Sequence, residues 1–117
     1  MLRPPMTAVE APSFLRDAGS LMTEEERGAL VAYVATNPGV GVVMPGTGGV
    51  RKIRWAGSGR GKRGGVRVIY YYCGEALPVF LLNVFAKNEK VDLSQAEKNE
   101  MKKWIPRLVA AYGRRSR

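Results

Sequence analysis

The residues best suited to chemistry in this sequence are three cations on two predicted neighbouring strands. In V-R-K-I-R-W, residues 50–55, Lys52 and Arg54 alternate with apolar residues, which is the pattern of a strand with one wet face and one packed face. Antiparallel pairing with the next apolar run, residues 66–72, would place Arg67 beside them. Like charges side by side are unfavourable unless an anion neutralises them, so this grouping indicates stabilisation of negative charge on a polyanion or carboxylate.

The overall charge favours a polyanion as the partner. The chain has 117 residues and carries 19 Lys and Arg against 10 Asp and Glu, a net charge of +9. No acidic residue occurs between Arg27 and Gly74. Such an uneven distribution is typical of a nucleic-acid-binding surface. The alternative is a solvated basic surface on a small basic protein.

Composition excludes several kinds of site. The chain has no histidine, which excludes a Ser-His-Asp triad, a histidine base and most catalytic zinc sites. The single cysteine, Cys73, cannot form an internal disulfide, and no apolar run leads the chain, so we expect a cytoplasmic protein. The longest uncharged candidate, residues 76–86, is too short for the roughly 20 residues of a membrane helix.

The elements that position the cations can be predicted along the chain. A short strand at residues 6–10 is followed by a brief helix or turn at 13–18. The capping box T-E-E-E, residues 23–26, begins a helix that ends at Asn37-Pro38-Gly39. Its packed side is expected to carry Leu30, Tyr33 and Val34. The glycine-rich residues 39–49 are expected to cross the sheet without regular structure.

The basic loop between the two cation-bearing strands invites comparison with a phosphate-binding loop. Its sequence, G-S-G-R-G-K-R at residues 57–63, lacks Ser or Thr after Gly-Lys and does not lead from a strand into a helix, so we reject that interpretation. It is either a plain hairpin loop or an arm whose Arg60, Lys62 and Arg63 bind nucleic-acid phosphates, and the two are compatible.

The last third of the chain predicts a buried strand and a closing helix. Residues 79–86 are nearly all apolar, as in a strand covered on both faces at the middle of a sheet. A second capping signal, S-Q-A-E at 94–97, begins a helix that Pro106 should kink or break. We therefore expect one α+β domain over residues 1–117, with flexible ends at about 1–5 and 113–117.

Three blocks of sequence resemble a known family. They are P-G-T-G-G-V-R-K-I-R-W at 45–55, G-K-R-G-G-V-R-V-I-Y-Y-Y at 61–72 and L-L-N-V-F-A-K-N-E-K-V-D-L-S at 81–94. In this order they resemble the HigB-like branch of the RelE/ParE toxin superfamily of bacterial type II toxin-antitoxin systems, over about residues 6–108. The resemblance implies a RelE-like α+β fold, in which a small, twisted, antiparallel-rich sheet has N-terminal helices and a C-terminal helix.

The resemblance also implies an activity, which is ribosome-dependent cleavage of mRNA. The basic residues of the family's strands fall on Lys52, Arg54 and Arg67, and the lysine after its last central strand falls on Lys87. Asp92 falls close to an acid of some HigB relatives. The arginine that follows the lysine in RelE is replaced here by Asn88, and the tyrosine of RelE and the histidines of some HigB toxins have no counterpart.

Cleavage of this kind needs no metal or cofactor. Attack of a ribose 2′-hydroxyl on the adjacent phosphate builds negative charge that fixed cations can stabilise. Lys52 is a candidate general base because neighbouring cations favour loss of its proton, and Tyr71 and Asp92 are its rivals. Five further cations are candidates for binding RNA: Arg51, Arg60, Lys62, Arg63 and Lys90.

Two other functions fit the same fold, since fold does not dictate function. One is inhibition of DNA gyrase, as in ParE-like toxins, and the other is RNA binding without cleavage. In the toxin interpretation the partners are the ribosome, mRNA and a cognate antitoxin, expected to be a helix-turn-helix protein. The charge of +9 suits an acidic segment of that antitoxin, which could cover the cations or enlarge the toxin until it cannot enter the ribosome.

Overall fold

The computed structural model describes residues 5–56, 65–86 and 92–115, with side chains described up to residue 112. Within these ranges the chain forms five strands and three helices. In order they are β1 (Ala8–Glu10), α1 (Pro12–Leu21), α2 (Glu24–Thr36), β2 (Val42–Val43), β3 (Val50–Trp55), β4 (Val66–Tyr71), β5 (Val79–Ala86) and α3 (Gln95–Arg115). None of the helices in the described ranges is both long and apolar enough to cross a membrane.

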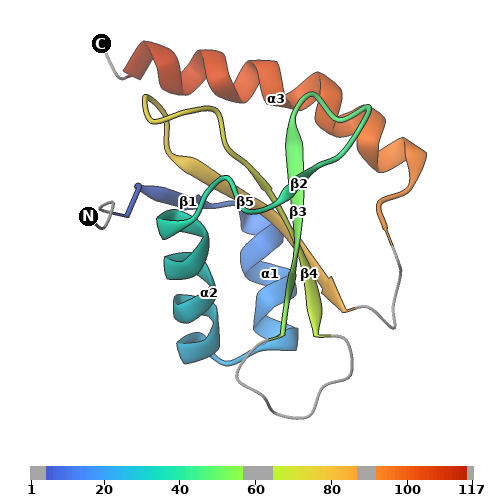
Figure 1. Cartoon of the computed structure of the whole chain (residues 1–117). Coiled ribbons are helices and arrows are strands. Elements are labelled where there is room, and N and C mark those ends of the chain that lie inside the picture. Colours follow the sequence, from blue (N-terminus) through green and yellow to red (C-terminus); the bar gives the residue numbers. More distant parts are fainter. Residues whose placement is uncertain (1–4, 57–64, 87–91, 116–117) are drawn as a thin grey trace.

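The strands form one mixed sheet in the order β1-β5-β4-β3-β2 (Figure 1). Strands β2 to β5 pair antiparallel, and β1 lies at the far edge, parallel to β5. The predicted α+β fold, with an antiparallel-rich sheet, N-terminal helices and a C-terminal helix, is confirmed. The prediction that β5 is the middle strand is wrong in one respect. Strand β5 is interior and buried on both faces, but β4 is central because β2 extends the other edge.

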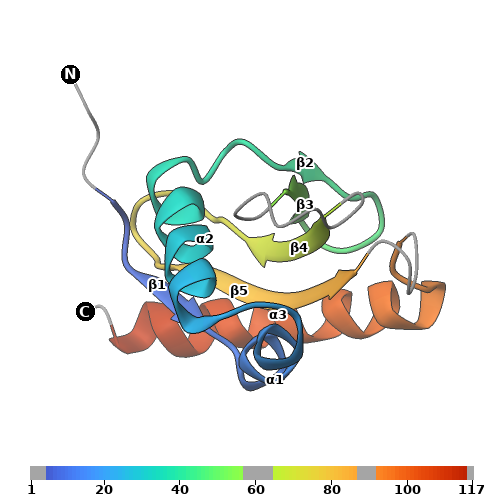
Figure 2. The same ribbon diagram turned by 90° about the horizontal axis from the view of Figure 1, so that it is seen from below.

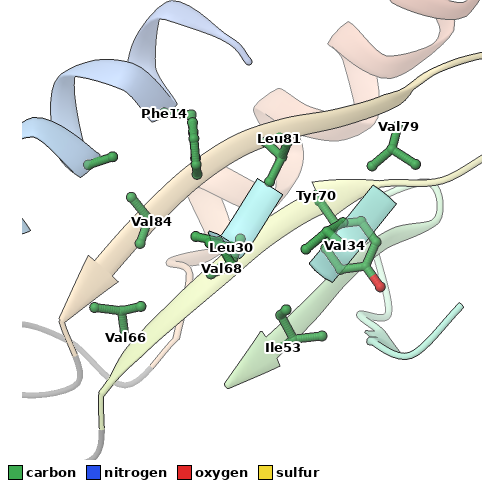
Figure 3. Packing of buried hydrophobic residues seen from close by; sticks show 11 residues of the cluster. Phe14, Leu30, Val34, Ile53, Val66, Val68, Tyr70, Val79, Leu81 and Val84 are labelled. Carbon is green, nitrogen blue, oxygen red and sulfur yellow. The ribbon is translucent and has the colours of Figure 1, made fainter. Parts of the chain in front are cut away.

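Helices α1 and α2 stand side by side and cover one face of the sheet (Figure 1). Phe14 of α1 and Leu30 and Val34 of α2 are fully buried there. Figure 3 shows them meeting the strand residues of this first core, which are Ile53, Val66, Val68, Tyr70, Val79, Leu81 and Val84. Burial of each such side chain stabilises the fold by about 1.5–3 kcal/mol, so this face holds the two N-terminal helices in place.

Helix α3 covers the opposite face and runs along β5 (Figure 2). Ile105 is its most buried residue, and the ring of Tyr112 meets Phe80 edge-on with 5.0 Å between centroids. The strand residues of this second core include Val50, Ile69, Tyr71, Phe80, Leu82 and Phe85. The protein therefore has three layers, and any strand residue that shares a face with Ile69 points towards the α3 side.

Both predicted capping boxes are present. The Thr23 hydroxyl accepts the Glu26 N–H at 3.1 Å, and the Thr23 N–H donates to the Glu26 carboxylate at 2.8 Å. The same exchange joins Ser94 and Glu97, at 3.1 and 2.7 Å. Each box satisfies backbone donors that the first turn of a helix leaves open, so α2 and α3 begin where the sequence predicts.

Two prolines lie in helices, and Pro106 behaves differently from the prediction. Pro12 ends β1 but also begins α1, because a first-turn proline loses no helical hydrogen bond, and the helix continues to Leu21. Pro106 does not break α3, which is continuous from Gln95 to Arg115. Its missing N–H leaves the carbonyl of Lys102 without a helical partner, but both residues lie on the exposed side, where water can replace that bond.

The segment predicted to be irregular, residues 39–49, contains the edge strand β2. Val42 and Val43 pair with Lys52 and Arg51 of β3, and their side chains are 71% and 49% exposed. Pairing with an existing strand supplies the order that a glycine-rich sequence does not supply alone. Tyr33, predicted to lie on the packed side of α2, is instead 36% exposed, with its ring 5.1 Å from that of Trp55.

A buried tyrosine fixes the path of the chain into β2. The Tyr70 hydroxyl, at the edge of the first core in Figure 3, donates to the Pro38 carbonyl at 2.7 Å and accepts the Gly41 N–H at 2.8 Å. A Cβ at position 41 would lie 2.7 Å from this hydroxyl, so the contact requires glycine. Burial is also the main reason that the pKa of Tyr70 is raised, which keeps the hydroxyl protonated.

Replacing this hydroxyl should therefore be costly. We expect Tyr70→Phe to lower the free energy of unfolding by about 1–3 kcal/mol, because it leaves a buried N–H and a buried carbonyl without a partner. Urea denaturation measures the change, and Tyr33→Phe, on an exposed ring, is the matched control. Equal stability of Tyr70→Phe and the wild type would contradict the role given to the hydroxyl.

Candidate functional site

The register of β3 and β4 brings the three predicted cations together on one face of the sheet. Arg54 lies directly opposite Arg67, and Lys52 lies opposite Ile69. Because Ile69 is buried in the second core, these side chains share the α3 side of the sheet. Lys52 and Arg67 are half-buried, whereas Arg54 is exposed. We call Lys52, Arg54 and Arg67 the cation cluster.

Asp92, just before α3, is the acid that the structure brings to this cluster. One of its carboxylate oxygens lies 3.2 Å from the Lys52 ammonium, and the other accepts the Leu93 N–H at 2.7 Å. Burial alone would raise the pKa of Asp92, but the Leu93 N–H and the Lys52 ammonium outweigh it and hold that pKa below its ordinary 3.8. The carboxylate is therefore ionised at neutral pH and fixes the position of Lys52.

Helix α3 adds basic residues that the sequence analysis did not identify. The charge of Lys98 also lowers the pKa of Asp92, which places Lys98 near the site. One turn later, the Cα of Lys102 would lie 3.9 Å from a Cβ at Gly48, in the loop that leads to β3. The sequence signal that identifies them is the spacing of four residues between Lys98 and Lys102, which puts both lysines on one side of a helix.

Arg51, predicted to bind RNA, is not brought to the cation cluster. Strand alternation places it on the other face of the sheet, with Ile53. Its guanidinium donates to the carbonyls of Gly41, at 2.7 Å, and Gly39, at 3.3 Å, and lies 5.8 Å from the centre of the Tyr72 ring. These contacts give Arg51 a structural task, which is holding the segment before β2.

Tyr71, a rival candidate for the general base, is a core residue. It is 8% exposed, and its ring lies 6.5 Å from that of Phe80. Burial, with a smaller contribution from Cys73, raises the pKa of Tyr71 to about 12. A phenol with this pKa keeps its proton at neutral pH and cannot accept another, so packing is the better interpretation.

The remaining predicted site residues lie outside the described part of the chain: Arg60, Lys62, Arg63, Lys87 and Lys90. The described strands β3 and β4 do flank the basic loop, as the rejection of a phosphate-binding loop requires. Within the described ranges, no group of three or more Cys, Asp or Glu side chains could hold a metal ion.

Chemically, the site is an excess of fixed positive charge beside one ionised carboxylate, among the residues described. Arg54 and Arg67 oppose one another directly, an arrangement that is unfavourable in an empty sheet and favourable when an anion binds between them. Because paired strands hold the backbone of all three residues, the cations start from neighbouring positions before a ligand arrives. The arrangement suits a phosphodiester, and above all one that gains negative charge during a reaction.

The Lys52–Asp92 pair gives a pH-dependent prediction. A carboxyl whose pKa is lowered by folding adds stability above its unfolded pKa and loses it as pH falls through the folded pKa. Asp92→Asn should therefore cost up to about 1 kcal/mol at pH 7, the range for a partly exposed pair. The difference from wild type should shrink as pH falls through about 3.8 and below. Urea denaturation at successive pH values measures it, and a difference that does not change with pH would contradict this account.

Comparison with protein-family models matches residues 45–114 to the RelE toxin of the RelE/RelB toxin-antitoxin system. The matched segment is more than half of the 117 residues and contains β3, β4, β5, Asp92 and most of α3. It therefore includes the whole cation cluster. Family membership also implies an antitoxin as partner. The chain belongs to the RelE toxin family of toxin-antitoxin systems.

Proposed function

We propose that the protein is a HigB-like mRNA endoribonuclease that acts on the ribosome and stops translation.

 It depends on the ribosome for its substrate and uses no metal ion. The single observation that supports this function is the cation cluster, which places Lys52, Arg54 and Arg67 on one face of paired strands. Membership of the RelE family supports a toxic activity of this class. In such a role the protein would work in the cytoplasm.

In the proposed reaction, a ribose 2′-oxygen attacks the adjacent phosphorus and the bond to the 5′-oxygen of the next nucleotide breaks. The 2′-hydroxyl loses a proton, the departing 5′-oxygen gains one, and the upstream fragment ends in a cyclic phosphate. Negative charge on the phosphoryl oxygens peaks at the five-coordinate stage. The cation cluster is fixed before the reaction begins, so it stabilises that charge without having to rearrange.

The roles within the site follow from its contacts. Arg54 and Arg67, opposite one another on β3 and β4, bind the phosphoryl oxygens. Lys52 adds a third positive charge, and Asp92 acts as a positioning residue that holds the Lys52 ammonium at 3.2 Å. Lys98 and Lys102 extend the basic surface along α3. On sequence grounds, Lys87 completes the site, and Arg60, Lys62, Arg63 and Lys90 contact the RNA backbone.

The function can be tested by mixing the purified protein with ribosomes carrying a defined mRNA. We expect the mRNA to be cut only when ribosomes are present. The same preparation should leave DNA supercoiling by gyrase unchanged. Intact mRNA together with inhibited gyrase would overturn the proposal in favour of a ParE-like function, and ribosome binding without cleavage would indicate an inactive relative.

The cation cluster can be tested residue by residue. Arg54→Ala and Arg67→Ala should each lower the cleavage rate by about 10²-fold or more, because each removes a preorganised partner of the transition-state charge. Arg16→Ala is the matched control, since it removes the same charge from an exposed side chain on α1. The exposed Arg54 should be replaceable with a change in unfolding free energy below about 0.5 kcal/mol. Cleavage at the wild-type rate by both folded variants would refute the assignment.

A further inference from the structure

A groove of about 400 Å³ lies on the side of α3 away from the cation cluster. It is formed where α3, strand β5 and the beginning of α1 meet. Its lining residues are Ala11, Ser13, Leu82, Asn83, Ala96, Glu97, Glu100, Met101 and Trp104. The lining is mainly apolar, and two glutamates stand on its α3 wall.

Helix geometry separates this groove from the proposed site. At 100° per residue, Ala96, Glu100 and Trp104 follow one another along one side of α3. Ile105 faces the second core, and Lys98 and Lys102 lie beyond it, on the side of Asp92 and Gly48. A molecule seated in the groove would therefore leave the cation cluster uncovered.

Trp104 is the residue of the groove whose exposure most strongly indicates a binding partner. Its side chain is 46% exposed, which makes it the largest exposed apolar side chain in the described part of the chain. Tryptophan is among the residues that most often dominate protein interfaces, because a single ring buries a large apolar area with little loss of conformational freedom. Met101 and Leu82 continue this apolar surface into the groove.

The charge of the groove is opposite to that of the protein. Glu97 and Glu100 line it, although the chain as a whole carries +9. The Glu100 carboxylate lies 3.6 Å from Lys103, but this pair is largely exposed and can exchange partners at little cost. One Glu97 oxygen accepts the Ser94 N–H of the capping box at 2.7 Å, a hydrogen bond that leaves the negative charge of Glu97 beside the groove. The groove fits an apolar segment that carries a basic side chain.

We propose that this groove is the docking site of the antitoxin, which inserts an apolar segment against Trp104 and sets a lysine or arginine between Glu97 and Glu100. The acidic part of the antitoxin still accounts for long-range attraction to the basic toxin, whereas the groove supplies the anchor. Bound in this way, the antitoxin leaves the cation cluster open. The inference rests on membership of the toxin-antitoxin family and is independent of mRNA cleavage.

The test uses the full toxin and the purified antitoxin encoded beside it, with the dissociation constant as readout. Trp104→Ala should weaken binding at least tenfold, because it removes an aromatic anchor. Glu100→Lys should also weaken binding more than the matched control Glu25→Lys, which changes the net charge equally at an exposed position on α2. Arg54→Ala, in the cation cluster, should change binding less than twofold to threefold.

A second measurement, the fluorescence of Trp104, does not depend on a loss of affinity for the antitoxin. In a Trp55→Phe protein, Trp104 is the remaining tryptophan of the toxin, so the emission left after subtracting that of the antitoxin alone reports on the groove. Binding of the antitoxin should shift this emission to shorter wavelength and protect it from iodide. Unchanged emission, unchanged affinity of both groove variants, or no binding by the wild type would overturn the proposal. Stronger weakening by Arg54→Ala, or by Val42→Lys on the β2 edge, would overturn it in favour of those surfaces. None of these results depends on whether mRNA is cut.

Discussion

The antiparallel pairing of β3 with β4 is the interaction on which the rest of the structure depends. This register determines which side chains of β3 lie on each face of the sheet. Ile53 lies in the first core, and the cation cluster lies on the side of α3. A shift of one residue would exchange the faces, burying charge on one side and exposing Ile53 on the other. The apolar residues of these strands therefore fix the register, and this register places Arg54 directly opposite Arg67.

The features that could be predicted from sequence are those determined by near neighbours in the chain. A strand repeats every two residues, so the shared face of Lys52 and Arg54 follows from spacing alone, and antiparallel pairing with the next strand places Arg67 opposite Arg54. The capping boxes at Thr23 and Ser94 each lie within four residues. In such cases local chemistry and the final fold agree, which is why the predictions for these elements are confirmed.

The features that could not be predicted depend on contacts between distant parts of the chain. Strand β2 exists because β3 is there to pair with it, and Pro106 is tolerated because its side of α3 faces water. The charge of Arg51 predicts RNA binding, but strand alternation places Arg51 on the Ile53 side of the sheet, where it contacts the segment before β2. The contact of Asp92 with Lys52 joins residues forty apart in sequence, and residue spacing carries no information about it.

The exposed edge formed by β2 has a consequence for how the protein behaves at high concentration. A sheet edge offers unpaired backbone groups to any other strand, and here Val42 and Val43 make that edge apolar as well. Two features oppose edge-to-edge aggregation: the strand is only two residues long, and every copy repels its neighbours through a charge of +9. The second protection weakens as salt screens the charge. The basic surface is thus also what keeps copies of this toxin apart, so the net charge of +9 contributes to its colloidal stability.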